Sequence, residues 1–337
     1  MKIAVGIDVS KSTLDVAVLE PGGKTAQFQV PNTPAGHGAL LDRARKAARP
    51  AGSALHFCME VTASYHHGLA LFLVEAGELV SVENPRRVRH FAVADGQVHK
   101  TDRADAKGIA RYALAMEPPP WRLSEPHLRE LVALDRRVTE LKAMRNQETN
   151  RLEAPCLPRL VEEGVAASVG AFDAQVLLLE GRIEEILSEN EVLAAQVELL
   201  ESVPGIARRS AVGLLAEAGD LAAYETAQDL AARLGLNPVQ RRSGTSLNGR
   251  SRISKAGNAH ARSRMYMPTV VAIRVNPPVR AFYERLVAAH KPKKSALLAA
   301  ERKLVMVCYG VLKSGKPFDP HHDPKKEAAP KEKGLTP

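Results

Sequence analysis

Four acidic residues occur where predicted strands end or a predicted helix begins. Asp8 ends the apolar run KIAVGID and Glu60 ends HFCME, while Asp102 and Asp105 are three residues apart in KTDRAD. Two acids spaced by three residues project from one face of a helix. Each acid alone has a plainer interpretation, because acids serve turns at strand ends and favour the first turn of a helix.

If the fold brings the four carboxylates together, their mutual repulsion would destabilise the site unless a divalent cation neutralised them. A ligand set made only of carboxylate oxygens suits Mg²⁺ or Mn²⁺ better than zinc. Such ions can hold a scissile phosphate between its attacking and leaving oxygens. The acids therefore indicate metal-dependent phosphodiester chemistry.

The second half of the chain offers a candidate nucleophile, Ser243, which follows Arg241 and Arg242 in the segment GLNPVQRRSG. A serine hydroxyl is a weak nucleophile that needs a base or a stabilising cation, and the two arginines could also hold a phosphate. Spacing alone is equally typical of an ordinary loop serine. The same glycine-punctuated, basic loop also contains Ser246, Ser251 and Ser254.

Positive charge is concentrated around this serine. The whole chain carries a net charge of +9, and residues 237–303 alone contain 15 lysines and arginines against two acids, Glu284 and Glu301. This distribution favours a polyanionic partner, namely nucleic acid. The predicted nucleic-acid-binding residues are Lys100, Arg103, Arg241, Arg242, Arg250, Arg252, Lys255, Lys293 and Lys294.

The elements that must position the acids lie in residues 1–122. Three β-rich runs are separated by short turns, and helices and strands then alternate through the segment that holds KTDRAD. Three hairpin strands followed by alternating helices and strands is the order of an α/β ribonuclease H-like fold, although other mixed α/β sheets share it.

Residues 123–200 are predicted to form a helical arm. Apolar residues from Val176 to Leu200 alternate steps of three and four, the pattern of a coiled coil, with Asn190 on the seam. Asn190 could fix the register and the number of partners, or it could lie at a local helix end. The coiled-coil interpretation predicts a homo-oligomer, a dimer or a tetramer.

Residues 201–315 are predicted to form a mostly α-helical, basic domain that carries the serine. Two short helices around Pro204-Gly205-Ile206 resemble a helix-hairpin-helix element, whose backbone N–H groups commonly meet a phosphate. Any tight helical turn would fit the same residues. The polar, lysine-rich tail 316–337 is predicted to be disordered.

Other classes of protein are disfavoured. No run approaches the length of a membrane span, and the N-terminus lacks the features of a signal peptide, so we expect a cytoplasmic protein without a membrane partner. Cys58, Cys156 and Cys308 are widely spaced and odd in number, which argues against a disulfide framework and a zinc knuckle.

Several motifs in order resemble one known family over residues 1–319. They are GIDVSKSTLDVAV, MEVTASY, VENPRRVRHFAVADGQVHKTDRADAKGIARY, VPGIARRSAVGLLAEAGD, GLNPVQRRSG, GRSRISKAGNAHAR and KPKKSALLAAERKL. The sequence is similar to the DEDD-type transposases of the insertion sequence one-ten group, which are related to Piv-type DNA invertases.

The resemblance implies a RuvC-like metal site at Asp8, Glu60, Asp102 and Asp105 and a nucleophile at Ser243. It also implies cleavage and rejoining of DNA through a covalent phosphoserine, guided by a structured noncoding RNA. One departure is Thr62-Ala63, where the family usually has Thr-Gly.

Three alternatives remain open. A RuvC-like nuclease that uses only carboxylates and water would tolerate loss of Ser243. A non-catalytic nucleic-acid-binding scaffold would bind in a salt-sensitive way and tolerate loss of the acids. An actin-like ATPase would need a second Gly-rich phosphate hairpin, which the sequence lacks.

Overall fold

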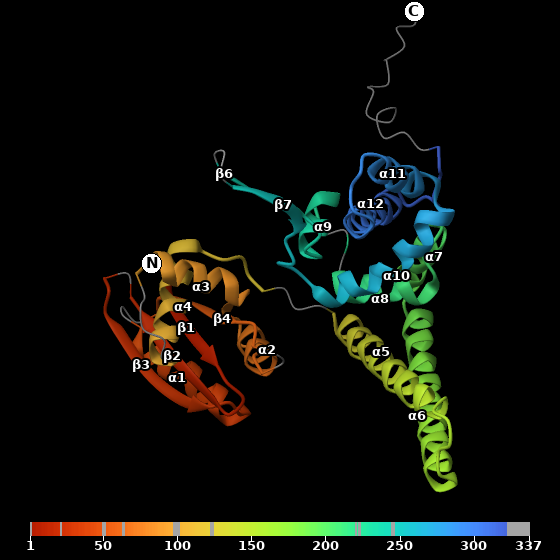
Figure 1. Cartoon of the computed structure of the whole chain (residues 1–337). Helices are drawn as coiled ribbons and strands as arrows, with labels where there is room; N and C mark the ends of the chain where they lie inside the picture. The colour runs from red at the N-terminus through yellow and green to blue at the C-terminus, as the bar shows by residue number, and fades with distance from the viewer. Residues whose placement is uncertain are drawn as a thin grey trace, which may run out of the picture. The chain divides into compact units, whose positions relative to one another are not determined.

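The computed structural model describes residues 2–20, 22–48, 52–62, 65–96, 102–121, 125–219, 221, 224–243 and 247–321. The chain forms two compact units, Met1–Leu123 and Ser124–Pro337 (Figure 1). Across the described ranges, no helix is both long and apolar enough to span a membrane. The three cysteines are free thiols.

The first unit is a mixed α/β sheet with helices, as its sequence predicts. Its elements are β1 (Lys2–Val9), β2 (Thr13–Leu19), β3 (Thr25–Pro31), α1 (Pro34–Ala47), β4 (Ala54–Glu60), α2 (His67–Glu75), β5 (Leu79–Glu83), α3 (Pro85–Ala94) and α4 (Asp102–Met116). The strand order is β3-β2-β1-β4-β5. The first three strands are antiparallel neighbours, and β4 and β5 join β1 in parallel.

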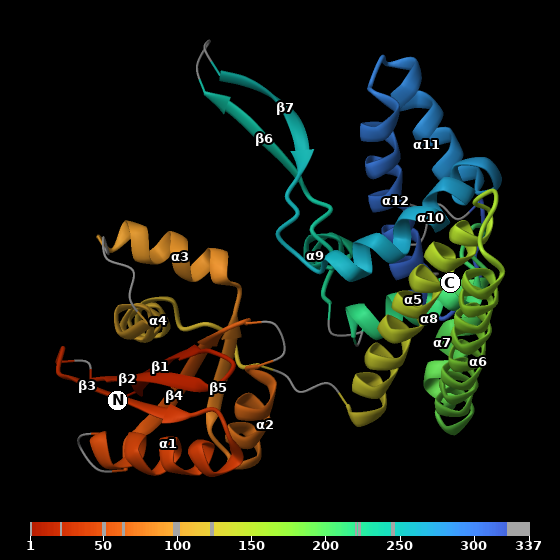
Figure 2. The ribbon, with the colours of Figure 1, turned by 60° about the horizontal axis from the view of Figure 1, so that its bottom comes forward.

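Alternation along the strands divides this sheet into two different faces. Large apolar residues such as Ile7, Val16 and Phe57 are buried on one face, against α1 and α2. Small residues such as Ala4 and Cys58 are buried on the other face, against α3 and α4 (Figure 2). Side chains two residues apart on a strand share a face, so residue type dictates which helices each face receives.

Helix α4 packs very closely on the face with small residues. A β-carbon on Gly6 of β1 would lie 2.2 Å from the carbonyl oxygen of Ala106 and 2.3 Å from the backbone nitrogen of Ala110. Any larger residue would push α4 away from the sheet. Gly6 therefore fixes how near the start of α4 comes to the end of β1.

The second unit is mostly helical. Its elements are α5 (Pro126–Leu152), α6 (Arg159–Glu189), α7 (Glu191–Glu201), α8 (Arg208–Ala218), α9 (Ala227–Arg233), β6 (Pro238–Ser243), β7 (Leu247–Ile253), α10 (Ala259–Val275), α11 (Pro277–Ala288) and α12 (Lys293–Ser314). Helices α5 and α6 pack along each other below the remaining helices of the unit (Figure 1).

The predicted coiled-coil seam is divided between two helices. Asn190 ends α6 with an extended backbone, at φ −133°, and its side chain accepts a hydrogen bond from the backbone N–H of Leu193 to begin α7. The seam from Val176 to Leu200 therefore extends over two helices, and a helix end lies at Asn190, as one of the two alternatives predicted. The coiled coil and the oligomer stay predictions. Asn190 stops the helix because its side chain replaces a lost backbone hydrogen bond.

The turn at Pro204-Gly205-Ile206 lies between α7 and α8, so two helices flank it as predicted. Gly205 has φ +102°, and a β-carbon there would lie 2.8 Å from the side chain of Ala272 in α10. The side-chain amide of Asn276 donates to the carbonyl oxygen of Pro204 at 3.2 Å. The turn thus packs against α10, and a phosphate-binding role for it stays a prediction.

Two neighbouring residues of α5 tie three helices together. Asp135 is buried and accepts hydrogen bonds from Arg264 of α10 and Arg209 of α8. Arg136 donates two hydrogen bonds to Glu217 of α8, at 2.6 and 2.8 Å. Buried charges need such partners, so these contacts fix α5 against the helices that carry the second half of the unit.

The segment predicted as a basic loop contains a β-hairpin. β6 and β7 pair in antiparallel fashion with Ser243 opposite Leu247, and residues 244–246 between them lie outside the described ranges. The prediction of a loop is wrong here. In the predicted tail, Phe318 packs against the core of the second unit and its backbone N–H donates to Ser202, whereas residues 322–337 lie outside the structure's description.

Candidate active site

Acidic residues form a row across four neighbouring strands of the first unit. Asp8 of β1 lies opposite Asp15 of β2, and Glu60 of β4 lies opposite Glu83 of β5. β1 and β4 are in parallel register with Ile7 opposite Met59, so Asp8 and Glu60 are the next residues on the two strands. Residues at the same level of adjacent strands point to the same face. The row therefore holds four carboxylates on one face of the sheet.

This face is the one covered by α4. Asp8 lies two residues beyond Gly6, which touches α4, and therefore shares its face. Asp105 immediately precedes Ala106, whose carbonyl oxygen lies over Gly6, and its side chain is half-buried. Asp102 is the first residue of α4, but its side chain lies outside the described parts of the chain.

The two outer acids of the row have cationic or amide partners. Asp15 is buried and accepts a hydrogen bond from the side-chain amide of Gln29 at 2.9 Å. Glu83 is buried and pairs with Arg87 at 3.2 Å. The inner acids, Asp8 and Glu60, are half-buried and thus more accessible than the two buried outer acids.

Two groups that can lose a proton, Cys58 and Tyr112, are buried near the row of acids. Burial raises the pKa of Cys58 to about 12, and Glu83 and Glu60 add to the rise. Burial also raises the pKa of Tyr112 to about 12, with a further rise from Glu83. Groups that lose a proton are thus held neutral beside the acids, which suits a site that attracts cations.

The donor set fits a hard divalent cation in its chemistry, because Asp8, Glu60 and Asp105 offer only carboxylate oxygens. Among the side chains that the structure describes, no three histidine, cysteine or acidic groups are close enough to hold a metal ion. Asp102, the remaining predicted ligand, is not among those side chains. The metal site at Asp8, Glu60, Asp102 and Asp105 therefore stays a prediction.

Sequence reasoning missed Asp15 and Glu83. Glu83 ends the strand LVSVE just as Glu60 ends the strand ALHFCME, and this similarity in sequence could have identified Glu83. Asp15 interrupts an otherwise apolar strand, TLDVAVL. Only the register of strand pairing places the two residues in one row with Asp8 and Glu60.

The predicted nucleophile lies in the second unit, as the last residue of β6. The strands of its hairpin pair with each other in a two-stranded sheet, and Figure 2 shows the hairpin projecting from the helices of that unit. The side chains of Arg241, Arg242, Ser243 and Arg250 lie outside the described parts of the chain. Nothing in the geometry therefore tests their predicted roles.

The base of the hairpin is held firmly on α9 and α10. The backbone N–H of Lys255 donates to the carbonyl oxygen of Gly235, and that of Asn258 donates to Arg233 at 2.7 Å. The guanidinium of Arg262 donates to the carbonyl oxygen of Leu234 at 2.8 Å. These bonds fix the direction in which the hairpin leaves the helices.

The other predicted nucleic-acid-binding residues are exposed where they are described. Arg252 lies on β7, Lys255 follows that strand with φ +55°, and Lys293 and Lys294 begin α12. Lys100 and the side chain of Arg103 lie outside the described ranges. Exposed cations on a projecting hairpin and at a helix start can reach a polyanion.

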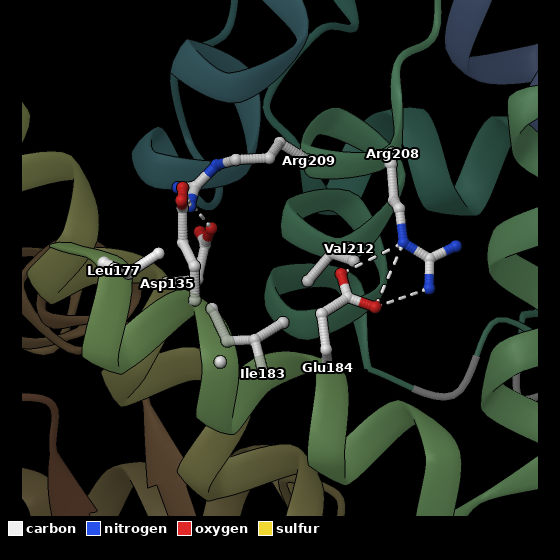
Figure 3. A pocket seen from close by; sticks show the side chains of 9 residues that line it. Asp135, Leu177, Ile183, Glu184, Arg208, Arg209 and Val212 are labelled. Carbon is white, nitrogen blue, oxygen red and sulfur yellow. Dashed lines mark hydrogen bonds and ion pairs between the residues drawn. The ribbon is translucent and has the colours of Figure 1, made fainter.

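A pocket of about 390 Å³ lies between α6 and α8 in the second unit (Figure 3). Its arginines already have acidic partners, since Arg208 pairs with Glu184 at 2.7 Å and Arg209 with Glu180 at 2.6 Å. The pocket thus offers no unpaired cation to an anionic ligand among its lining residues. We assign it no part in the chemistry of the carboxylates.

Family models match both halves of the chain. A model described as "Transposase" matches residues 5–160, and one described as "Transposase IS116/IS110/IS902 family" matches residues 197–284. The first match spans the row of acids, and the second spans the hairpin.

The chain is also similar to individual proteins of this kind. The chain is 30% identical to the pilin gene-inverting protein of Moraxella bovis over 268 residues, which cover 79% of this chain and 83% of that protein. It is 30% identical to an uncharacterized 43.6 kDa protein of insertion element IS110 from Streptomyces coelicolor over 46% of this chain and 37% of that protein. A structure described as "T. thermophilus RuvC in complex with Holliday junction substrate" aligns with 36% of this chain and 100% of its own chain, at 18% identity and a TM-score of 0.27.

Proposed function

We propose that this chain, which belongs to the IS110 family of transposases and is similar to pilin gene-inverting proteins, cuts DNA strands and rejoins them in a new arrangement. The observation that carries the proposal is the row of carboxylates beneath α4. Asp8 and Glu60 lie side by side on adjacent strands, and Asp105 lies in the first turns of the helix that packs over them. This arrangement supports a ribonuclease H-like catalytic unit.

Asp8, Glu60, Asp102 and Asp105 would hold Mg²⁺ or Mn²⁺. When bound, such ions stabilise the negative charge that develops on a phosphate during transfer. The protein's own part is to keep the carboxylates at fixed spacing on a rigid sheet. The partners of Asp15 and Glu83 keep the outer acids from competing for the cation.

Ser243 would act as the nucleophile. Its hydroxyl oxygen would lose its proton and form an ester bond to the scissile phosphorus, while the bond from phosphorus to one nucleoside oxygen breaks and that oxygen takes up a proton. A free hydroxyl of another strand would then attack the phosphoserine and restore the serine. The neighbouring Arg241 and Arg242 would hold the phosphate through paired hydrogen bonds.

Nucleic-acid binding would involve the basic hairpin and the start of α12. The exposed Arg252, Lys255, Lys293 and Lys294 support this proposal, and the strands of the hairpin also contain Arg241, Arg242 and Arg250. A structured noncoding RNA as guide, a homo-oligomeric assembly and a cytoplasmic location also belong to the proposal. Their support is the family and the charge distribution of the chain.

The test is DNA cleavage by the purified chain with Mg²⁺ and RNA transcribed from the flank of its own gene. We compare the wild type with Asp8→Asn and Ser243→Ala, and we look for a protein–DNA adduct on a denaturing gel. The matched controls are Asp42→Asn, an exposed acid of α1, and Ser251→Ala, a serine of the same hairpin. We expect the adduct to vanish in both test variants and to persist in both controls.

A RuvC-like hydrolytic nuclease is the second candidate, because the row of acids lies within one unit and includes no serine nucleophile. Cleavage that survives Ser243→Ala without any adduct would establish this candidate. Binding without cleavage in every condition, unchanged by Asp8→Asn, would establish the non-catalytic scaffold.

A further inference from the structure

One side-chain amide connects the two chain segments that follow Asp8 and Glu60. Asn32 lies between β3 and α1, and its amide nitrogen donates to the carbonyl oxygen of Ser10 at 2.9 Å and to that of Tyr65 at 3.2 Å. Ser10 is the second residue after Asp8, and Tyr65 is the fifth after Glu60. The two hydrogens of one amide thus bridge the ends of two neighbouring strands.

Asn32 is itself held in place on both sides. Its backbone N–H donates to the carbonyl oxygen of Ser12, in the turn between β1 and β2, at 2.9 Å. Its side-chain oxygen lies 2.9 Å from Nε2 of His37 on α1. Since that oxygen can only accept, His37 must donate, and this contact fixes which end of the amide faces the two carbonyl groups.

The histidine is well suited to this task. His37 is buried, its ring lies 5.9 Å from that of Phe72 on α2, and burial lowers its pKa. A neutral imidazole with its proton on Nε2 can donate to the oxygen of Asn32 without bringing a charge into the core. The hydrogen bonds of Asn32 therefore connect His37 of α1 with the segments that follow β1 and β4.

We propose that Asn32 is a positioning residue that sets the spacing between Asp8 and Glu60. This inference rests on the proposed metal site. The parallel pairing of β1 with β4 extends to Ile7 opposite Met59, one residue before Asp8 and Glu60. The amide of Asn32 supplies a further connection between the two segments that follow these acids. A residue that orients metal ligands from behind typically changes metal affinity by about 10- to 100-fold when it is lost.

Asn32→Asp is the most informative change because it keeps the shape and removes the donor. A carboxylate cannot donate to either carbonyl group, so both bridging bonds are lost. Thr33→Ala is the matched control. The hydroxyl of Thr33 accepts from the backbone N–H of Gly36 at 3.2 Å to begin α1, but it does not touch the bridge.

The experiment measures Mn²⁺ binding to the full-length chain without nucleic acid, by counting free Mn²⁺ with electron paramagnetic resonance. The dissociation constant should rise about 10- to 100-fold in Asn32→Asp and stay unchanged in Thr33→Ala. Amide hydrogen exchange provides a second readout. Exchange should increase in residues 10–13 and 65–70 of Asn32→Asp, whereas Thr33→Ala should affect only the first turn of α1.

Unchanged Mn²⁺ affinity in a folded Asn32→Asp variant overturns the inference. If that variant does not fold, Asn32→Ser, whose shorter side chain cannot span both carbonyl groups, is judged by the same criterion. A wild type that does not bind Mn²⁺, or an Asp8→Asn variant that binds as well as the wild type, overturns the metal site and this inference together. Loss of binding in Asp8→Asn alone overturns the inference and leaves the proposed function standing.

Discussion

Glu217 is expected to be a main electrostatic anchor of the second unit. Its side chain is 2% exposed and receives two hydrogen bonds from Arg136 of α5, which is 43% exposed. The amide of Asn258, which begins α10 at the base of the hairpin, donates to Glu217 at 2.7 Å. One carboxylate thus joins α5, α8 and α10.

Glu217→Gln keeps the size of the side chain and removes its charge. Breaking a fully buried ion pair costs about 3–5 kcal/mol, but solvent screens the half-exposed Arg136, so we expect a loss of about 2 kcal/mol in unfolding free energy. For a unit of this size such a loss lowers the melting temperature by about 4–8 °C. Glu140→Gln, which removes an exposed partner of Arg137 on the same helix, should cost less than about 0.5 kcal/mol.

The dependence on pH provides a second check. Burial by itself would raise the pKa of Glu217, but hydrogen bonds from Arg136 and Asn258 outweigh it, and the pKa is lowered. A lowered pKa in the folded state contributes stability above the unfolded value of 4.5, and this stability is lost as the pH falls through the folded value. The difference between wild type and Glu217→Gln should therefore be complete at pH 7 and shrink below about pH 4.5.

Circular dichroism at 222 nm follows the helices of both units, and the longest of these helices lie in the second unit, while fluorescence follows Trp121, the only tryptophan, in the first unit. We expect Glu217→Gln to shift the helical transition and leave the Trp121 transition in place. Equal stability of the variant and the wild type at pH 7 would refute the reasoning, because it would mean that the carboxylate and its two donors contribute nothing net.

Three further predictions concern the sheet, the core and the basic surface. Gly6→Ala should destabilise the first unit by about 3 kcal/mol or more, measured by Trp121 fluorescence in urea, because its β-carbon would strike the backbone of α4. Gly22→Ala, where nothing lies within 4 Å, should be neutral. Glu301 is 1% exposed, and burial raises the pKa of its side chain to about 7. Because the pKa in the unfolded chain is 4.5, the free energy of unfolding should fall progressively as the pH rises from 4.5 to about 7. Glu301→Gln should flatten the fall in melting temperature between pH 5 and pH 8, and an unchanged fall would contradict this. Arg252→Ala should weaken DNA binding and reduce the slope of log K against log salt by about 0.9, and an unchanged slope would remove Arg252 from the phosphate contacts.

The first unit could largely be predicted from its sequence, because its apolar alternation and turn residues agree with the final sheet. The three β-rich runs form neighbouring strands, helices and strands then alternate as the pattern indicates, and a helix begins at Asp102 in KTDRAD. Helix α3 was not predicted, although Asn84 caps it and Pro85 follows, the usual start of a helix. Basic residues separate the few apolar residues of α3, so no apolar periodicity indicated a helix there.

The candidate site could be predicted only in part. Sequence position suggested Asp8 and Glu60, but Asp15 and Glu83 join them through pairing between strands that are distant in sequence. The bridge made by Asn32 likewise depends on contacts over 22 and 33 residues of separation. Such contacts depend on the register of the strands and on the packing of the helices, and neither can be predicted from a local sequence pattern.

The second unit shows two local competitions that a pattern of apolar residues does not reveal. At Asn190 a side-chain cap interrupts a seam that hydrophobic spacing alone would continue. In residues 238–253, arginines and glycines suggested a loop, yet backbone pairing forms a hairpin whose base is fixed by its bonds to α9. In both places hydrogen bonding of the backbone decides the structure.

The division of the first sheet into an apolar face and an acidic face has a consequence for tolerated insertions and deletions. Adding or removing one residue within β1 would exchange the two faces of that strand, turning Asp8 toward the apolar core and Ile7 toward α4. A carboxylate without a partner there would cost several kcal/mol, and α4 would lose the space that Gly6 provides. Genes that gain or lose a single codon within β1 should therefore yield chains that fail to fold. The alternation that brings the carboxylates to one face of the sheet thus also makes a strand register shifted by one residue unfavourable.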